Sequence, residues 1–116
     1  STLTVSFADN ASLSAAFNVG GRRIMGIQMD ATWDAAVLTF QNSIDGGATY
    51  KDVIPDSGTE LQLTVAADKY VPLSAENQVL LASCQLLKAR SGTSATPVTQ
   101  TTGTTRTLTL VLGQTL

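Results

Sequence analysis

The fold of this chain is decided by residues 107–112, which read Thr-Leu-Thr-Leu-Val-Leu. Successive side chains of a β-strand point to opposite faces, so leucine at every second position predicts a strand with one face in a core and one in water. The same alternation appears in residues 3–7 and 61–65. Threonine, which is β-branched and favours strands, occurs 17 times in the 116 residues. These patterns predict a fold built from β-strands.

Further strands are expected where apolar and β-branched residues gather between turn residues. They are Leu13–Phe17, Arg23–Met29, Val37–Ser43, Tyr50–Val53, Tyr70–Leu73 and Gln78–Ala89. The intervening segments 9–10, 20–21, 45–47 and 55–58 contain the Gly, Asn, Asp and Pro residues that tight turns favour. A total of about eight or nine short strands predicts an all-β fold, either an antiparallel β-sandwich or a jelly roll.

Two segments fit a strand less well. Asp30–Ala36 is expected to form a loop or a single helical turn, and Ser74 has the character of a helix N-cap ahead of a short turn. The length of 116 residues suits a single β-sandwich domain, 1–116. Within it, we expect residues 1–10 to be able to extend as an arm. The polar residues 91–104 are expected to form a flexible loop.

The composition excludes several function classes. The chain has no histidine, which excludes a Ser-His-Asp triad and a His-rich metal site. Its single cysteine, Cys84, excludes an internal disulfide and is expected to be a small buried hydrophobic residue. Lys and Arg number 7 against 9 Asp and Glu, a net charge of −2 that argues against nucleic-acid binding. Apolar runs stay well below the ~20 residues of a membrane span, so no membrane partner is expected.

Paired carboxylates are the only catalytic option that this composition leaves. Asp30 and Asp34 flank Trp33, which suggests a glycosidase acid and base, but their spacing carries no signature of that chemistry. We interpret them as two solvated loop acids, and we expect neither enzymatic activity nor a cofactor. The acidic residues of 45–56 do not follow a calcium-loop pattern, and Asp45 is more simply a turn residue.

A resemblance to a known family runs through residues 21–51. Its motifs are Gly-Ile-Gln-Met at 26–29, Ala-Thr-Trp at 31–33, and Leu-Thr-Phe-Gln-Asn-Ser-Ile-Asp-Gly-Gly-Ala-Thr-Tyr at 38–50. Later come Lys-Ala-Arg-Ser-Gly-Thr at 88–93 and Pro-Val-Thr-Gln at 97–100, ahead of the terminal strand. Together these motifs resemble small virion proteins of tailed bacteriophages and of gene transfer agents, over about residues 15–112. The chain departs from that pattern in two loops, with Asp30 in place of a proline and an extra glycine in 45–50.

The resemblance implies a structural protein of the virion, either a head decoration (cement) protein or the base that seats a head spike or fibre. Its expected partners are the major capsid protein or other virion proteins. The chain itself is expected to form a homo-oligomer on the particle. Ser1 suits a chain that has lost its initiator Met and was made in the host cytoplasm, so the expected location is the virion. The candidate contact residues, for an interface or a glycan, are Trp33, Asp45, Tyr50, Arg90, Thr93 and Gln100.

An alternative function stays open at this point. Ser43-Ile44-Asp45-Gly46 followed by Tyr50 is similar to a turn of discoidin-like jelly rolls, which suggests a carbohydrate- or surface-binding β-sandwich module. In that interpretation Trp33 and Tyr50 form an aromatic platform for a host glycan. The competing interpretation of Trp33 is a core residue or an interface anchor.

Overall fold

Two antiparallel sheets form the framework of the chain, whose computed structural model describes residues 1–101 and 103–115. Within these residues the strands are β1 (Thr2–Phe7), β2 (Arg22–Gln28), β3 (Leu38–Ser43), β4 (Lys51–Asp52), β5 (Tyr70–Pro72), β6 (Leu86–Ser91) and β7 (Arg106–Thr115), and α1 (Ala75–Ala82) joins β5 to β6. The larger sheet has the order β1-β7-β2-β5 and the smaller one the order β4-β3-β6. The predicted all-β class is therefore confirmed.

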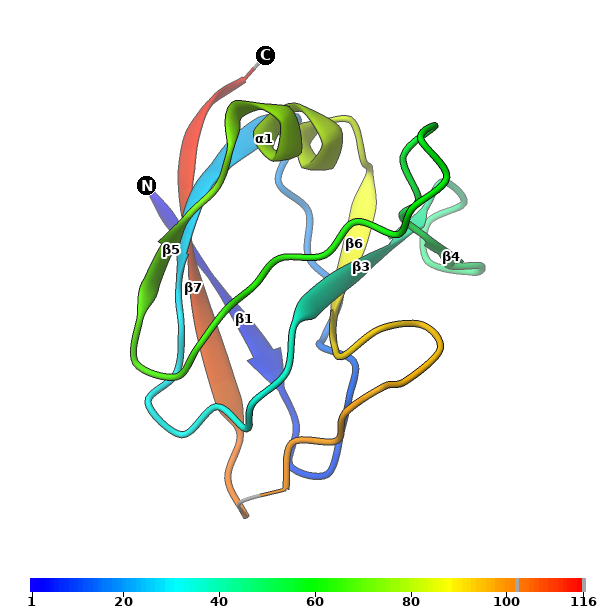
Figure 1. Cartoon of the computed structure of the whole chain (residues 1–116). Coiled ribbons are helices and arrows are strands. Elements are labelled where there is room, and N and C mark those ends of the chain that lie inside the picture. Colours follow the sequence, from blue (N-terminus) through cyan, green and yellow to red (C-terminus); the bar gives the residue numbers. More distant parts are fainter. Residues whose placement is uncertain (102, 116) are drawn as a thin grey trace.

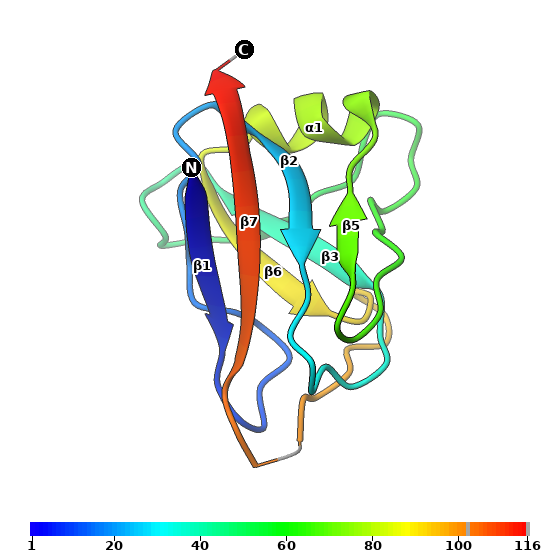
Figure 2. The same cartoon turned by 90° about the vertical axis from the view of Figure 1, so that its left-hand side faces the viewer.

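The two sheets lie face to face with the core between them. Figure 2 shows the larger sheet in front and the smaller sheet behind it, while Figure 1 shows α1 across the end near the C-terminus. The predicted alternation of residues 107–112 is confirmed, because the three leucines are buried. The larger sheet buries Val5, Phe7, Ile24, Ile27, Leu108 and Leu110, and the smaller one buries Leu38, Phe40, Leu87 and Ala89.

The N-terminal segment, for which an extending arm was expected, lies in the molecule's own larger sheet. Residues 2–7 form β1, which pairs antiparallel with β7 and sets Leu3 opposite Leu110 and Val5 opposite Leu108. Figure 2 shows β1 as the edge strand of this sheet. One side of β1 is thus paired with β7, and its other side forms an outer edge of the sheet.

The prediction of a strand over Gln78–Ala89 is wrong in its first half, where α1 forms. The predicted N-cap is confirmed: the Ser74 hydroxyl accepts a hydrogen bond from the Asn77 backbone N–H at 3.2 Å. The helix then buries Leu81 and Ala82, and the chain enters β6 only at Leu86. A short apolar run such as Val-Leu-Leu does not distinguish a strand from a helix by its periodicity, so the cap was the better signal.

Two predicted strands make isolated bridges instead of continuous ladders. Residues 13–17 run beside β6, with bridges from Leu13 to Arg90 and from Phe17 to Leu87. Residues 61–65 bridge β3 once, through Leu63 and Leu38, yet they keep the predicted alternation of buried and exposed side chains. The described residues therefore hold seven continuous strands instead of the expected eight or nine.

The predicted flexible loop 91–104 is closed on itself by one β-bridge and held to the molecule by another. A bridge joins Gly92 to Pro97, and another joins Gln100 to Ala11. Residue 102 of this loop lies outside the described residues. Figure 1 shows the loop swinging out from the end of β6 before it returns toward β7.

Candidate interaction surface

An apolar groove opens beside the β3–β4 hairpin, with two exposed isoleucines along it. Ile44 is 78% exposed and Ile54 is 53% exposed. The groove has a volume of 460 Å³ and is lined by Asn42, Ile44, Asp45, Thr49, Lys51, Asp52, Val53, Ile54 and Cys84. We name it the isoleucine groove. Of its lining, only Asp45 is among the candidate contact residues predicted from the sequence, although an isoleucine inside a turn was a signal.

The hairpin that presents Ile44 is fixed by hydrogen bonds around Asp45. The Ser43 hydroxyl donates to the Asp45 carboxylate at 2.7 Å, and the Thr49 N–H donates to the same oxygen at 2.9 Å. These bonds, that from Ser43 foremost, lower the pKa of Asp45. Asp45 therefore stays ionised at neutral pH and orders the turn, which agrees with its interpretation as a turn residue.

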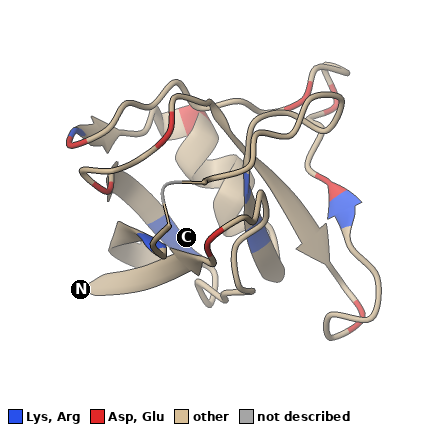
Figure 3. Cartoon of the chain, turned by 90° about the horizontal axis from the view of Figure 1, so that it is seen from below, with Lys and Arg blue, Asp and Glu red and all other residues tan. Residues whose placement is uncertain are grey.

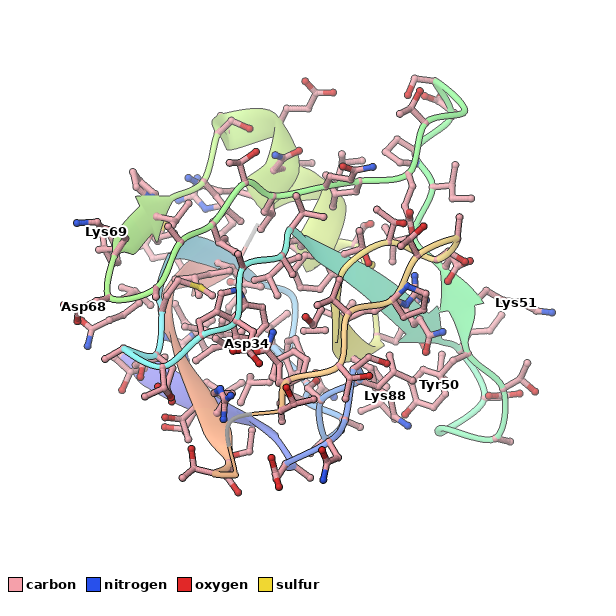
Figure 4. All side chains as sticks on the ribbon, turned by 60° about the horizontal axis from the view of Figure 1, so that its bottom comes forward. Asp34, Tyr50, Lys51, Asp68, Lys69 and Lys88 are labelled. Atoms are coloured by element: carbon pink, nitrogen blue, oxygen red, sulfur yellow. The ribbon has the colours of Figure 1, made fainter. Side chains whose placement is uncertain are left out.

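Tyr50 lies on the other side of this hairpin, against a lysine. The Nζ atom of Lys88 lies 4.6 Å from the centre of the Tyr50 ring, a cation–π arrangement. Figure 4 shows the two side chains next to each other, while Lys51 points away from the molecule. One face of the Tyr50 ring is thus occupied by the ammonium group of Lys88.

Arg90 is buried on the outer side of the smaller sheet and pairs with two acids. Its guanidinium group donates to the Asp52 carboxylate and, at 3.0 Å, to Glu60. The hydroxyl of Ser94 donates to Asp52 at 2.6 Å, and its N–H donates to both oxygens of Glu60. The bond from Ser94, followed by that from Arg90, lowers the pKa of Asp52. This cluster, the Arg90 cluster, joins β4, β6 and two loops.

Thr93 belongs to the turn that brings Ser94 to this cluster. Its N–H donates to the Thr96 carbonyl at 3.1 Å, and its hydroxyl accepts from the Thr96 N–H at 3.0 Å. The preceding Gly92 has φ of +88° and lies so close to the returning chain that a Cβ atom would be 2.5 Å from the Thr96 oxygen. Only glycine fits at position 92, which explains the Ser-Gly-Thr sequence of this turn.

Gln100 is fully buried and ties three segments together. Its side-chain oxygen accepts from the Asp34 N–H at 2.7 Å, and its amide nitrogen donates to the Asp34 carbonyl and the Ser91 hydroxyl. A buried amide whose oxygen and nitrogen are both hydrogen-bonded fixes local geometry. The structure thus gives Arg90, Thr93 and Gln100 internal partners that hold the 91–104 loop to the sheet.

Trp33 lies in the core with 5% of its surface exposed. Its ring meets Phe7 edge to face at a centroid distance of 5.2 Å, and its indole N–H donates to the Ala36 carbonyl. Of the two interpretations, the core residue is confirmed. The structure does not bring Trp33 and Tyr50 onto one accessible face, because Trp33 is enclosed.

The loop acids Asp30 and Asp34 bind backbone groups. Burial acts to raise the pKa of Asp30, but hydrogen bonds from the N–H groups of Thr107 and Thr32 outweigh it and lower that pKa. Asp34 accepts from the Thr101 N–H at 2.8 Å and pairs with the buried Arg106 at 3.3 Å. Both carboxylates therefore serve to anchor loops at the end of the larger sheet where β7 begins.

Charged groups are distributed without a single dominant sign on the face seen in Figure 3, where the acids lie largely in loops and both signs meet in β4.

Burial raises the pKa of the Cys84 thiol at the groove wall, which keeps it protonated at neutral pH. Among the residues that the structure describes, no three His, Cys, Asp or Glu side chains are grouped to hold a metal ion. The described helix is not long and apolar enough to cross a membrane.

Comparison of the chain with protein-family models, with curated protein sequences and with solved structures finds no match in any of the three.

Proposed function

We propose that this chain is a structural protein of a virus particle that docks on the capsid through protein–protein contacts, as head decoration or as the base of a spike or fibre. The observation that supports it most directly is the isoleucine groove. Two large aliphatic side chains exposed to water, one of them on a hydrogen-bonded turn, mark a surface that gains free energy when a protein partner covers it. The sequence resemblance over about residues 15–112 supplies the class of partner.

The rim of the groove indicates what fits into it. Asp45 and Lys51 line it, so both signs of charge flank the apolar centre formed by Ile44, Ile54 and Val53. A partner surface with an apolar side chain between polar or charged groups is complementary to it. We propose the major capsid protein, or another virion protein, as that partner, on the assembled virion.

We further propose that the fold is a jelly roll. If residues 13–17 are taken as an eighth strand beside β6, the smaller sheet has the order 13–17, β6, β3, β4. The larger sheet has the order β1-β7-β2-β5. Eight strands in two four-stranded sheets, with this crossing of the chain between them, support a jelly roll, an architecture found in viral capsid and lectin domains.

The alternative function, a glycan-binding module, has less structural support than the docking role. Of its two aromatic side chains, Trp33 is enclosed in the core and Tyr50 has one ring face against Lys88. A sugar would have to stack on the remaining face of Tyr50. Binding to a glycan array that disappears in Tyr50→Ala would favour this alternative.

We expect gold-labelled chain to decorate particles purified from the phage or host that encodes it, and the double variant Ile44→Ser/Ile54→Ser to lose at least about tenfold of the bound copies. Removing both side chains deletes the apolar centre of the contact, where interface residues contribute most. Electron microscopy of labelled particles measures this. The matched control is Val79→Ser, an exposed aliphatic residue on α1 that does not line the groove. Particles that bind neither chain, or that bind both variants alike, contradict the proposal.

A further inference from the structure

The free edge of β1 differs from the other edges of the two sheets. An edge strand with unpaired N–H and C=O groups accepts a further strand unless it is short, charged, interrupted by proline or covered. The sheet orders give outer strands β1 and β5 in the larger sheet, and β4 and β6 in the smaller one. These four strands are the positions at which a further strand could add to a sheet.

Three of the four edges are protected. The strand β5 is only three residues long, and its Pro72 has no N–H group to donate. The strand β4 has two residues, and both are charged, Lys51 and Asp52. The edge of β6 is covered by residues 12–17, as shown by the hydrogen bonds from the Phe17 N–H to the Leu87 carbonyl and back, each 2.8 Å long. None of these edges suits a long additional strand.

The edge of β1 is neither charged nor interrupted by proline, and among the described residues it is covered only at Ser6. Its six residues, Thr-Leu-Thr-Val-Ser-Phe, include no charge, proline or glycine. The Ser1 carbonyl accepts from Leu112 on β7, whereas the Ser6 carbonyl accepts from Ala15 on the opposite side. Because hydrogen-bonding groups alternate along a strand, the N–H and C=O groups of Thr2 and Thr4 point outward. Among the described residues, no backbone group pairs with these outward N–H and C=O groups. The open stretch of the edge is therefore Thr2–Thr4.

We propose that a second copy of this chain pairs with this edge, β1 antiparallel to β1, about a two-fold axis at Leu3. In that register the outward groups of Thr2 meet those of Thr4 in the second copy, and each donor faces an acceptor at both ends. The half-buried Leu3 then lies against its own counterpart. The pairing joins the two larger sheets into one and forms a closed contact that uses the same patch on both copies.

The open stretch favours a second copy over an unrelated strand. It is short, and it is symmetric about Leu3, with one outward threonine on either side, so it is complementary to itself. No charged residue of β1 opposes the contact, although the whole chain has a net charge of −2. This inference concerns the isolated chain and stands independently of the proposed virion role.

The test is hydrogen exchange of the unmodified chain together with sedimentation velocity, up to about 1 mM protein. We expect a reversible dimer whose formation slows exchange of the Thr2 and Thr4 amides. The amides of Leu3 and Val5 already bond to β7 and should not change with concentration. A chain that stays monomeric over this range, or a dimer that leaves the Thr2 and Thr4 amides unaffected, overturns the proposal.

Matched lysine variants test the location of the contact. Thr4→Lys places a charge on the exposed side of the open edge, and we expect it to raise the dimer dissociation constant at least about tenfold. Gln28→Lys adds the same charge to an exposed position of β2, two strands from the edge, and should leave the constant unchanged. Equal weakening by both variants, or by neither, counts against the β1 edge.

Discussion

Replacing Arg90 with alanine is expected to lower the free energy of unfolding by about 3–5 kcal/mol, because it leaves two carboxylates in the Arg90 cluster without their cation. The guanidinium group is almost fully buried and pairs with both Asp52 and Glu60. It also donates to the hydroxyl of Thr39 beneath it. Its removal therefore takes one hydrogen-bond partner at once from Asp52 on β4, from Thr39 on β3 and from Glu60 in the loop that follows β4. Urea unfolding followed by circular dichroism measures the loss.

The control for this prediction is Arg23→Ala. Arg23 is half-buried on β2 and, within the described residues, makes no ion pair. We expect its replacement to cost well under half as much as that of Arg90. A similar loss in both variants would mean that the packing of the arginine stem, and not its pairing with the acids, stabilises this part of the fold.

The pH dependence of unfolding provides a second measurement on the same cluster. The pKa of Asp52 is lowered in the folded chain, first by Ser94 and then by Arg90. A lowered pKa contributes stability that is fully present above the unfolded value of about 3.9 and is lost as the pH falls through the folded pKa. Asp52→Asn should therefore flatten the acid side of the stability profile. An unchanged profile would show that Asp52 contributes little to acid unfolding.

The parts of this fold that sequence reasoning found are those written in local periodicity. The spacing of Leu108 and Leu110 alone predicts β7, and the side-chain oxygen of Ser74 predicts the start of α1. By contrast, the partners of Arg90 come from residues 30 and 38 positions away. Such pairs depend on how the sheets and loops meet, which no local pattern encodes.

The candidate site shows the same division. The turn at Asp45 follows from its Asp-Gly sequence, but the exposure of Ile44 depends on what packs against the hairpin. Trp33 looked equally suited to a core and to a binding platform because aromatic rings serve both. Its contact with Phe7, which is distant in sequence, decides between them.

Trp33→Ala is expected to destabilise the fold by about 3–5 kcal/mol, since it removes a large buried ring and leaves a cavity that the two sheets cannot close. The ring is enclosed in the core and meets Phe7 edge to face. A loss of this size is a large share of the stability of a domain of this length. Thermal and urea unfolding followed by far-ultraviolet circular dichroism measure it, because the chain has no other tryptophan for fluorescence.

Tyr50→Ala is the matched variant, because both aromatic residues were candidates for the same glycan platform. Tyr50 is partly exposed and touches the Lys88 ammonium, so its removal should cost no more than about 1 kcal/mol. A large difference between the two variants follows from enclosure against exposure, and it assigns Trp33 to the core by energetics as well as by geometry. If Trp33→Ala instead unfolds at the same urea concentration as Tyr50→Ala, the ring does not stabilise the core as its burial implies.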